Sequence, residues 1–108
     1  MKVNVGCDIV KISRFANMDK KVLRKLFHKK ELQNAEAENL AGLFAANESC
    51  KKIINDLSWH DIEIIKKRNG KPTLLLQDKS DIEDIDVSIS HDGEYAMATV
   101  VFLRKDGS

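Results

Sequence analysis

The sequence predicts one α+β domain over residues 1–108, with helices packed on a mostly antiparallel sheet. Its length of 108 residues corresponds to a single domain. Apolar residues recur at helical spacing through most of the first half and alternate with polar residues in the second half. Two dipeptides typical of tight β-turns, Asn69-Gly70 and Asp92-Gly93, separate the alternating runs. Helices segregated from hairpin-linked strands are typical of α+β domains.

The first half of the chain is predicted to be a strand followed by helices. Residues 3–10 begin with the alternation of a strand. Residues 12–27 carry apolar side chains at helical spacing, and we expect two helical pieces with a break at residues 17–19. Residues 29–37 are expected to form a short helix or helical turn. The strongest helix prediction covers residues 38–55, which contain alanines and leucines and no proline.

The second half is predicted to consist of two hairpins. Residues 59–66 alternate between polar and apolar, and residues 73–77 form their partner strand across the first turn. Pro72 stands at the start of that partner strand, where its missing N–H donor is tolerated. Residues 87–91 and 95–103 form the second pair of strands across the second turn.

The composition favours a folded domain without a general affinity for nucleic acid. Apolar residues make up 43% of the chain and charged residues 32%, with a formal net charge of +1. General nucleic-acid binding usually requires a strongly basic domain. Basic residues nevertheless gather in residues 19–30 and acidic residues in 78–86. The basic run is either a solvated helix face or a surface for an acidic partner.

The cysteines and the absence of long apolar segments predict a cytoplasmic protein. Cys7 and Cys50 form no CxxC pair, so we expect small buried thiols rather than a disulfide framework. Asn4 and Asp8 interrupt the first apolar run, which therefore does not resemble a signal peptide. No segment is long enough to cross a membrane, and we expect no membrane contact.

Three charged residues are candidates for catalysis. Asp8 interrupts an apolar strand, where a carboxylate is costly to bury unless it is paired or bound to a metal. Its alternative role is to cap the following helix. Glu48 and Lys52 share one face of the long helix, and their alternative role is a surface ion pair worth a few tenths of a kcal/mol. Ala41 and Ala45 on that face would let a backbone or a ligand approach closely.

Ser90 and His91 form a second candidate group at the end of a strand, beside a tight turn. A hydroxyl, an imidazole and free backbone amides at this place could hold a phosphate. The alternative is a histidine that caps the hairpin. Adjacent strand residues point to opposite faces, so the two do not form a nucleophile–base pair.

Six blocks of sequence contain these candidates and keep a fixed order along nearly the whole chain. They are Val5 to Arg14, Phe27 with Lys30-Glu31-Leu32, Leu40 to Lys52, Trp59 to Ile64, Asn69 to Pro72, and Val87 to His91 with Tyr95 to Ala98. The blocks closely resemble those of holo-acyl-carrier-protein synthases, which are 4′-phosphopantetheinyl transferases. Because several blocks match in one order, the resemblance is far more specific than any single block.

The resemblance implies an enzyme that moves 4′-phosphopantetheine from coenzyme A to a serine of an apo acyl carrier protein, releasing 3′,5′-ADP. It implies that Asp8 and Glu48 are ligands of Mg²⁺, which commonly takes one or two carboxylates together with phosphate oxygens and waters. Lys52 would lie near the phosphates or the incoming serine, where it would stabilise charge or assist proton removal. Ser90 and His91 would lie near the phosphates of coenzyme A.

The same resemblance implies a homotrimer with active sites between neighbouring subunits. Arg14 and the basic helix, with Lys21, Arg24 and Lys25, would meet the acidic recognition helix of the acyl carrier protein. This role gives the uneven charge of the chain a purpose.

Two departures from the family's pattern leave alternatives open. The family usually has lysine at the position of Asn47, and losing a cation beside a phosphate site would weaken coenzyme A binding or slow transfer. The family also has a glycine-rich loop before the tryptophan strand, where this chain runs through Asn55-Asp56-Leu57 to Ser58. The alternative functions are a degenerate coenzyme A binder with little or no transferase activity and a carrier-protein interaction module.

Overall fold

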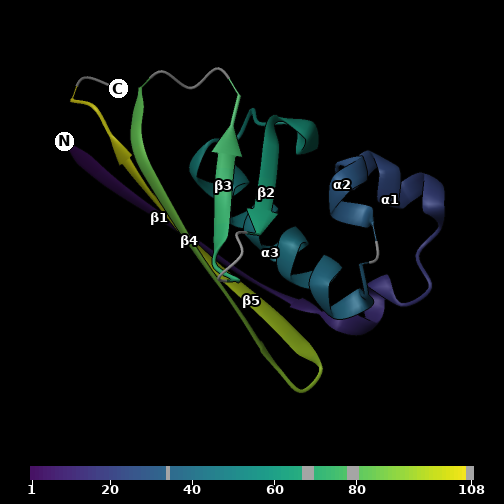
Figure 1. Ribbon diagram of the computed structural model, residues 1–108. Coiled ribbons are helices and arrows are strands. Elements are labelled where there is room, and N and C mark those ends of the chain that lie inside the picture. Colours follow the sequence, from purple (N-terminus) through teal and green to yellow (C-terminus); the bar gives the residue numbers. More distant parts are fainter. Residues whose placement is uncertain (34, 67–69, 78–80, 107–108) are drawn as a thin grey trace.

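The computed structural model describes residues 1–33, 35–66, 70–77 and 81–106. Its strands form two antiparallel sheets, and Figure 1 shows the longest helix beside them and two short helices lying further to one side. The elements follow in the order β1 (Lys2–Lys11), the 3₁₀ turn η1 (Ile12–Phe15), α1 (Lys20–Leu26), α2 (Lys29–Leu32), α3 (Ala37–Ile53), the 3₁₀ turn η2 (Trp59–Asp61), β2 (Ile62–Lys66), β3 (Pro72–Leu76), β4 (Ile82–Asp92) and β5 (Tyr95–Arg104). The predicted α+β class and the order of its elements are confirmed.

The strands form two sheets rather than the one that the sequence suggested. β5 lies between β1 and β4 in a three-stranded antiparallel sheet, and β2 pairs with β3 in a separate hairpin. Gly93 sits in the turn between β4 and β5 with a positive φ of 58°, which glycine adopts without steric cost. Gly70 has a φ of 82° before β3, whereas Asn69, the other residue of that predicted turn, lies outside the described residues.

Two local contacts explain where the observed elements begin. The break expected at residues 17–19 is confirmed, because η1 ends at Phe15 and α1 begins at Lys20, where the Asp19 carboxylate accepts the Lys21 N–H at 2.7 Å. The strand predicted from Trp59 begins only at Ile62. There, the Asp61 carboxylate accepts the Ser58 N–H at 2.9 Å and stabilises a 3₁₀ turn over the three residues before β2.

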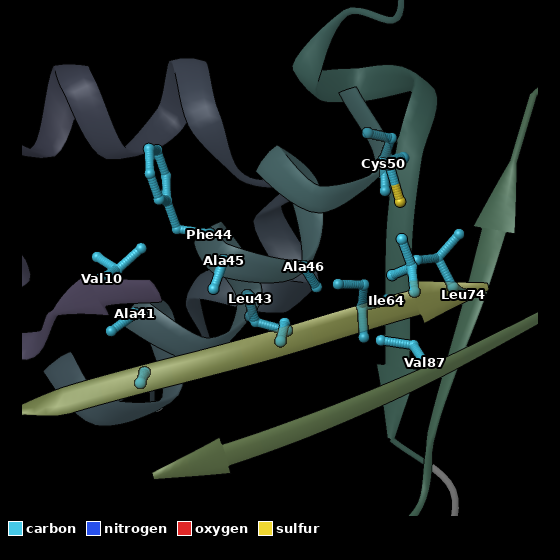
Figure 2. Close-up of a cluster of buried hydrophobic side chains, with 14 of the residues drawn as sticks. Val10, Ala41, Leu43, Phe44, Ala45, Ala46, Cys50, Ile64, Leu74 and Val87 are labelled. Carbon is cyan, nitrogen blue, oxygen red and sulfur yellow. The ribbon is translucent and has the colours of Figure 1, made fainter. Parts of the chain in front are cut away.

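The hydrophobic core lies around α3, which is buried along most of its length. Its face toward the three-stranded sheet is lined with small residues, among them Ala41 and Ala45, which are fully buried. The other side of the helix packs against the hairpin. Figure 2 shows Cys50 of α3 in one cluster with Ile64, Leu74 and Val87 of three different strands. The small residues therefore serve close approach by the sheet backbone.

A buried carboxylate holds the short helix α2 against the hairpin. Glu31 is 8% exposed and accepts the His28 N–H at 2.7 Å and the Ile64 N–H at 3.1 Å. Desolvation raises the pKa of this carboxyl above its usual range, although both hydrogen bonds and His28 oppose the shift. A second contact joins α1 to η2, where His60 Nε2 lies 3.1 Å from the Arg24 carbonyl oxygen.

The outer face of the three-stranded sheet is open and is apolar along β1 and β5, whereas β4 places the exposed Asp86, Ser88 and Ser90 on it. Exposed apolar side chains alternate along its two adjacent strands, namely Val3, Val5 and Ile9 on β1 and Tyr95, Met97 and Val101 on β5. Cys7 belongs to this face and is exposed, so the expectation that both thiols are buried is wrong for Cys7. Cys50 is buried as expected, and burial raises the pKa of its thiol to about 12. Within the described residues, no helix has the length and apolar character needed to cross a bilayer.

Candidate active site

The structure brings Asp8 and Lys52 into direct contact. The Lys52 ammonium donates to the Cys7 carbonyl oxygen at 2.7 Å and to Asp8 Oδ1 at 3.2 Å. The Asp8 side chain is 20% exposed and the Lys52 side chain 53% exposed, so the pair sits at the rim of the core. Asp8 does not cap the following helical turn, since Lys11 occupies that position and makes no side-chain cap.

Glu48 lies one helical turn before Lys52 on α3 and is half-buried. Its carboxylate makes no hydrogen bond or ion pair with any of the described residues, and the predicted alternative of a Glu48–Lys52 surface pair is not formed. The rim thus holds one carboxylate paired with an ammonium and a second without a partner in this part of the chain. Such a pair of oxygen donors could ligate a hard divalent cation.

Two residues that the sequence did not single out fix where Asp8 and Glu48 lie. A methyl group added at Gly6 would lie 2.1 Å from the Ser49 carbonyl oxygen, so β1 and α3 touch backbone to backbone there. The Ser49 hydroxyl donates to the Ala45 carbonyl at 2.7 Å and lies 3.3 Å from the carbonyl oxygen of Ala98, the residue opposite Asp8. A glycine within a strand was the available signal, because it marks close approach by another backbone.

His91 is tied to the beginning of α3, away from Lys52. Its Nε2 lies 3.1 Å from the Glu38 main-chain oxygen and its Nδ1 lies 3.6 Å from Glu38 Oε1. At about 1.5 Å per residue, Glu38 and Lys52 are about 21 Å apart along the helix. His91 therefore connects β4 to α3 rather than capping its own hairpin.

Ser90 points away from the other candidates. It lies opposite Met97, which in turn lies opposite Ile9, so the Ser90 side chain belongs to the open apolar face of the sheet. His91 faces α3 on the other side, because neighbouring strand residues alternate. A single chain thus brings Asp8 and Lys52 together but does not bring Ser90 to them.

The predicted partner-binding residues are all exposed. Arg14, on η1, places its guanidinium 5.1 Å from the centroid of the Phe44 ring, and Phe44 stacks on Trp59 with centroids 5.1 Å apart. The other three, Lys21, Arg24 and Lys25, lie on α1 with their side chains turned to solvent. This placement agrees with both alternatives given by the sequence, a solvated helix face and a surface for an acidic partner.

Asn47 is completely buried on α3, and neither polar atom of its side chain has a hydrogen-bond partner within the described residues. A buried amide without partners is destabilising by about 1–3 kcal/mol. We expect Asn47→Leu to raise the free energy of unfolding by about 1–2 kcal/mol, as measured by urea denaturation at a fixed chain concentration. The exposed Asn55→Leu is the control, expected to change stability by less than about 0.5 kcal/mol. A destabilised Asn47→Leu protein would mean that the amide has a partner beyond the single chain.

Comparison with known proteins assigns the family. The sequence model of the 4′-phosphopantetheinyl transferase superfamily matches residues 4–100. Holo-acyl-carrier-protein synthase of Nautilia profundicola is 38% identical, covering 93% of this chain and 99% of the relative. That of Caldanaerobacter subterraneus subsp. tengcongensis is 33% identical over the whole of both chains. The crystal structure of the Helicobacter pylori enzyme in complex with coenzyme A has a TM-score of 0.83 and 32% identity, covering 93% of this chain and 100% of that one. This chain therefore belongs to the holo-acyl-carrier-protein synthase family within the 4′-phosphopantetheinyl transferase superfamily.

Proposed function

We propose that this protein transfers 4′-phosphopantetheine from coenzyme A to a serine of an apo acyl carrier protein. The observation that carries the proposal is the cluster at the junction of β1 and α3, where Lys52 contacts Asp8 one turn after Glu48, which has no partner among the described residues. Family membership supports the same function, since relatives along the whole chain are holo-acyl-carrier-protein synthases. Solved relatives are described with coenzyme A or its 3′,5′-ADP portion bound.

Asp8 and Glu48 are proposed to hold Mg²⁺. The donor set fits this metal, because the two carboxylates are half-buried and Glu48 makes no competing bond within the described chain. No group of three or more potential ligands occurs among the described residues, and Mg²⁺ needs only one or two carboxylates when phosphates and waters complete its shell. When bound, the metal would neutralise negative charge that builds on the pyrophosphate during cleavage.

The proposed chemistry is displacement at the β-phosphorus of coenzyme A. The serine oxygen of the carrier forms a new P–O bond, the bridging P–O bond to the 3′,5′-ADP portion breaks, and 3′,5′-ADP leaves with the bridging oxygen. The serine proton passes to a base or to solvent. Lys52, whose side-chain nitrogen lies 2.7 Å from the Cys7 carbonyl oxygen and 3.2 Å from Asp8 Oδ1, would supply positive charge to the phosphates. His91, which contacts the beginning of α3, would border the coenzyme site at the end of the helix opposite Lys52. Ser90 lies on the outer face of the sheet, so it would contact coenzyme A only at that face.

Mass spectrometry of the carrier tests the proposed function. Purified apo acyl carrier protein is incubated with this protein, coenzyme A and Mg²⁺, and a parallel sample contains EDTA. We expect the mass of one phosphopantetheine group to be added only in the sample without EDTA. Coenzyme A binding with no mass gain on several carriers would instead favour the degenerate binder, with Asn47 and the missing glycine-rich loop as its cause.

The exposed basic side chains of η1 and α1 are proposed to bind the carrier protein. Their charge suits an acidic helix, and association of this kind depends on complementary charge. We expect Arg24→Glu to raise the KM for acyl carrier protein about tenfold and to leave the KM for coenzyme A unchanged, as measured by steady-state kinetics. Lys105→Glu, near the far end of β5, is the control with the same change of charge. If both variants changed the KM for acyl carrier protein equally, α1 would not be part of the interface.

We further propose that the outer face of the three-stranded sheet joins the subunits of a homotrimer. The proposed number of subunits, three, rests on the family resemblance. The exposed apolar side chains of β1 and β5 support the association, because contiguous exposed apolar surface commonly marks an interface. Ile9, 62% exposed at the middle of this face, is the position to test. An interface here would also bring Ser90 of one subunit toward its neighbour.

Ile9→Glu is expected to convert the assembly to monomers, because a buried carboxylate without a partner is strongly unfavourable. Light scattering coupled to size exclusion measures the mass. Ile65→Glu is the control, since Ile65 is 44% exposed on β2, in the other sheet. An unchanged mass for Ile9→Glu, or equal dissociation of both variants, would show that this face is not the interface.

A further inference from the structure

We propose that Lys52 is the counter-ion of Asp8 in the absence of metal and that a divalent cation must displace it. The displaced ammonium then pairs with the phosphates of the anionic coenzyme. The inference rests on the proposed function, because the cation and the coenzyme bind at the same cluster. It adds a coupling between the two ligands: binding of the cation makes Lys52 available to the coenzyme.

The geometry shows that Lys52 already occupies the place of a cation. Its ammonium is held by two acceptors on β1, the Cys7 carbonyl oxygen at 2.7 Å and Asp8 Oδ1 at 3.2 Å. A hard cation bound to the Asp8 carboxylate would lie within a few ångströms of this ammonium. Two positive charges at such a distance repel strongly, more so because Asp8 is only 20% exposed.

The pair is also weak enough to be exchanged. The Lys52 side chain is 53% exposed, and ion pairs in such surroundings contribute little to stability because water screens them. Lysine carries its charge on a flexible four-carbon stem, so the ammonium can move away while α3 stays in place. Glu48, without a partner among the described residues, offers the second carboxylate that makes the exchange favourable for a divalent ion.

The consequence is a coupling between cation and coenzyme. Without the cation, Lys52 is engaged by Asp8 and contributes little to the binding of phosphates. With the cation bound, the ammonium is free to pair with them. Each ligand must then strengthen the binding of the other by the same factor, since coupling between binding sites is reciprocal.

Binding of Mn²⁺ in the absence of coenzyme tests the competition. Mn²⁺ accepts the same carboxylate ligands as Mg²⁺ and is counted directly by electron paramagnetic resonance. We expect Lys52→Met to tighten Mn²⁺ binding about two- to fivefold at constant ionic strength, the range that a partly exposed ion pair allows. Lys51→Met is the matched control and should change the affinity less than about twofold. It removes the same charge from the same turn, but the Lys51 ammonium lies over Trp59, 4.1 Å from the ring centroid.

Calorimetric binding of 3′,5′-ADP, with and without Mn²⁺, tests whether the displaced Lys52 ammonium contributes to nucleotide affinity. Lys52→Met should weaken nucleotide binding severalfold with Mn²⁺ present and hardly at all without it. Unchanged or weaker Mn²⁺ binding by Lys52→Met would overturn the inference, because the lysine would then not compete with the cation. A wild-type protein that binds no Mn²⁺ would refute the metal site as well, whereas the transfer assay judges the proposed function independently of Lys52.

Discussion

Gly6→Ala is expected to lower the free energy of unfolding by about 3 kcal/mol or more and to remove transferase activity. The added methyl group would lie 2.1 Å from the Ser49 carbonyl oxygen and 2.9 Å from its carbonyl carbon. Both atoms belong to the helix backbone and cannot turn aside as a side chain can. α3 would have to move away from β1, which would separate Glu48 and Lys52 from Asp8. Urea denaturation at a fixed chain concentration measures the stability, and phosphopantetheine transfer measures the activity.

Gly93→Ala is the control for this substitution. No heavy atom lies within 4 Å of a methyl group placed there, so the cost is limited to the positive φ of 58°. That cost is about 1 kcal/mol for a residue other than glycine. If Gly6→Ala destabilised the protein no more than Gly93→Ala does, β1 and α3 would not be in backbone contact.

Asp8→Asn is expected to reduce kcat/KM for transfer at least about 100-fold, while changing the free energy of unfolding by less than about 1 kcal/mol. The amide keeps the shape of the side chain but loses the charge that pairs with Lys52 and that would ligate the metal. Glu48→Gln should have a similar effect, since Mg²⁺ would then retain a single carboxylate. Steady-state transfer kinetics at several Mg²⁺ concentrations measure the loss and whether excess metal restores part of it.

Glu83→Gln provides the control, because Glu83 is an exposed carboxylate on β4. It should leave kcat/KM and the dependence on Mg²⁺ unchanged. Should Asp8→Asn or Glu48→Gln retain wild-type kinetics, the carboxylate concerned would not belong to the active site, and the proposed metal ligands would have to be replaced by others.

Local patterns in the sequence predicted most of the fold. Alternation identified the first strand, and an apolar, partly β-branched run after a tight turn identified the last. The two glycine-containing turns placed the hairpins, because these features depend on neighbouring residues alone. The start of β2 was missed for a local reason, since the Asp61 carboxylate bonds to Ser58 N–H and makes a 3₁₀ turn of the alternating residues before Ile62. The exposure of Cys7 was missed because an apolar strand at the edge of an open sheet has the same pattern as a buried one.

The candidate site was predicted by type of residue and not by arrangement. A carboxylate in an apolar strand and a Glu–Lys spacing of four on a helix indicated chemistry, and family resemblance combined them. The pairing of Lys52 with Asp8 instead of Glu48 required the structure, because both alternatives satisfy the sequence. The opposite orientation of Ser90 and His91 follows from alternation, but only strand register shows that Ser90 shares a face with Ile9 and Met97.

The sequence by itself determined the element order, the α+β class and the family, since each depends on short-range patterns or on blocks of residues kept in order. Only the tertiary structure decided that the strands divide into two sheets, that Asn47 is buried with no hydrogen-bond partner in the described part of the chain and that Lys52 is held by β1. The reason is the contact between Gly6 and Ser49, 43 positions apart in the chain. Close packing of two backbones sets which side chains meet, and no local pattern encodes that distance.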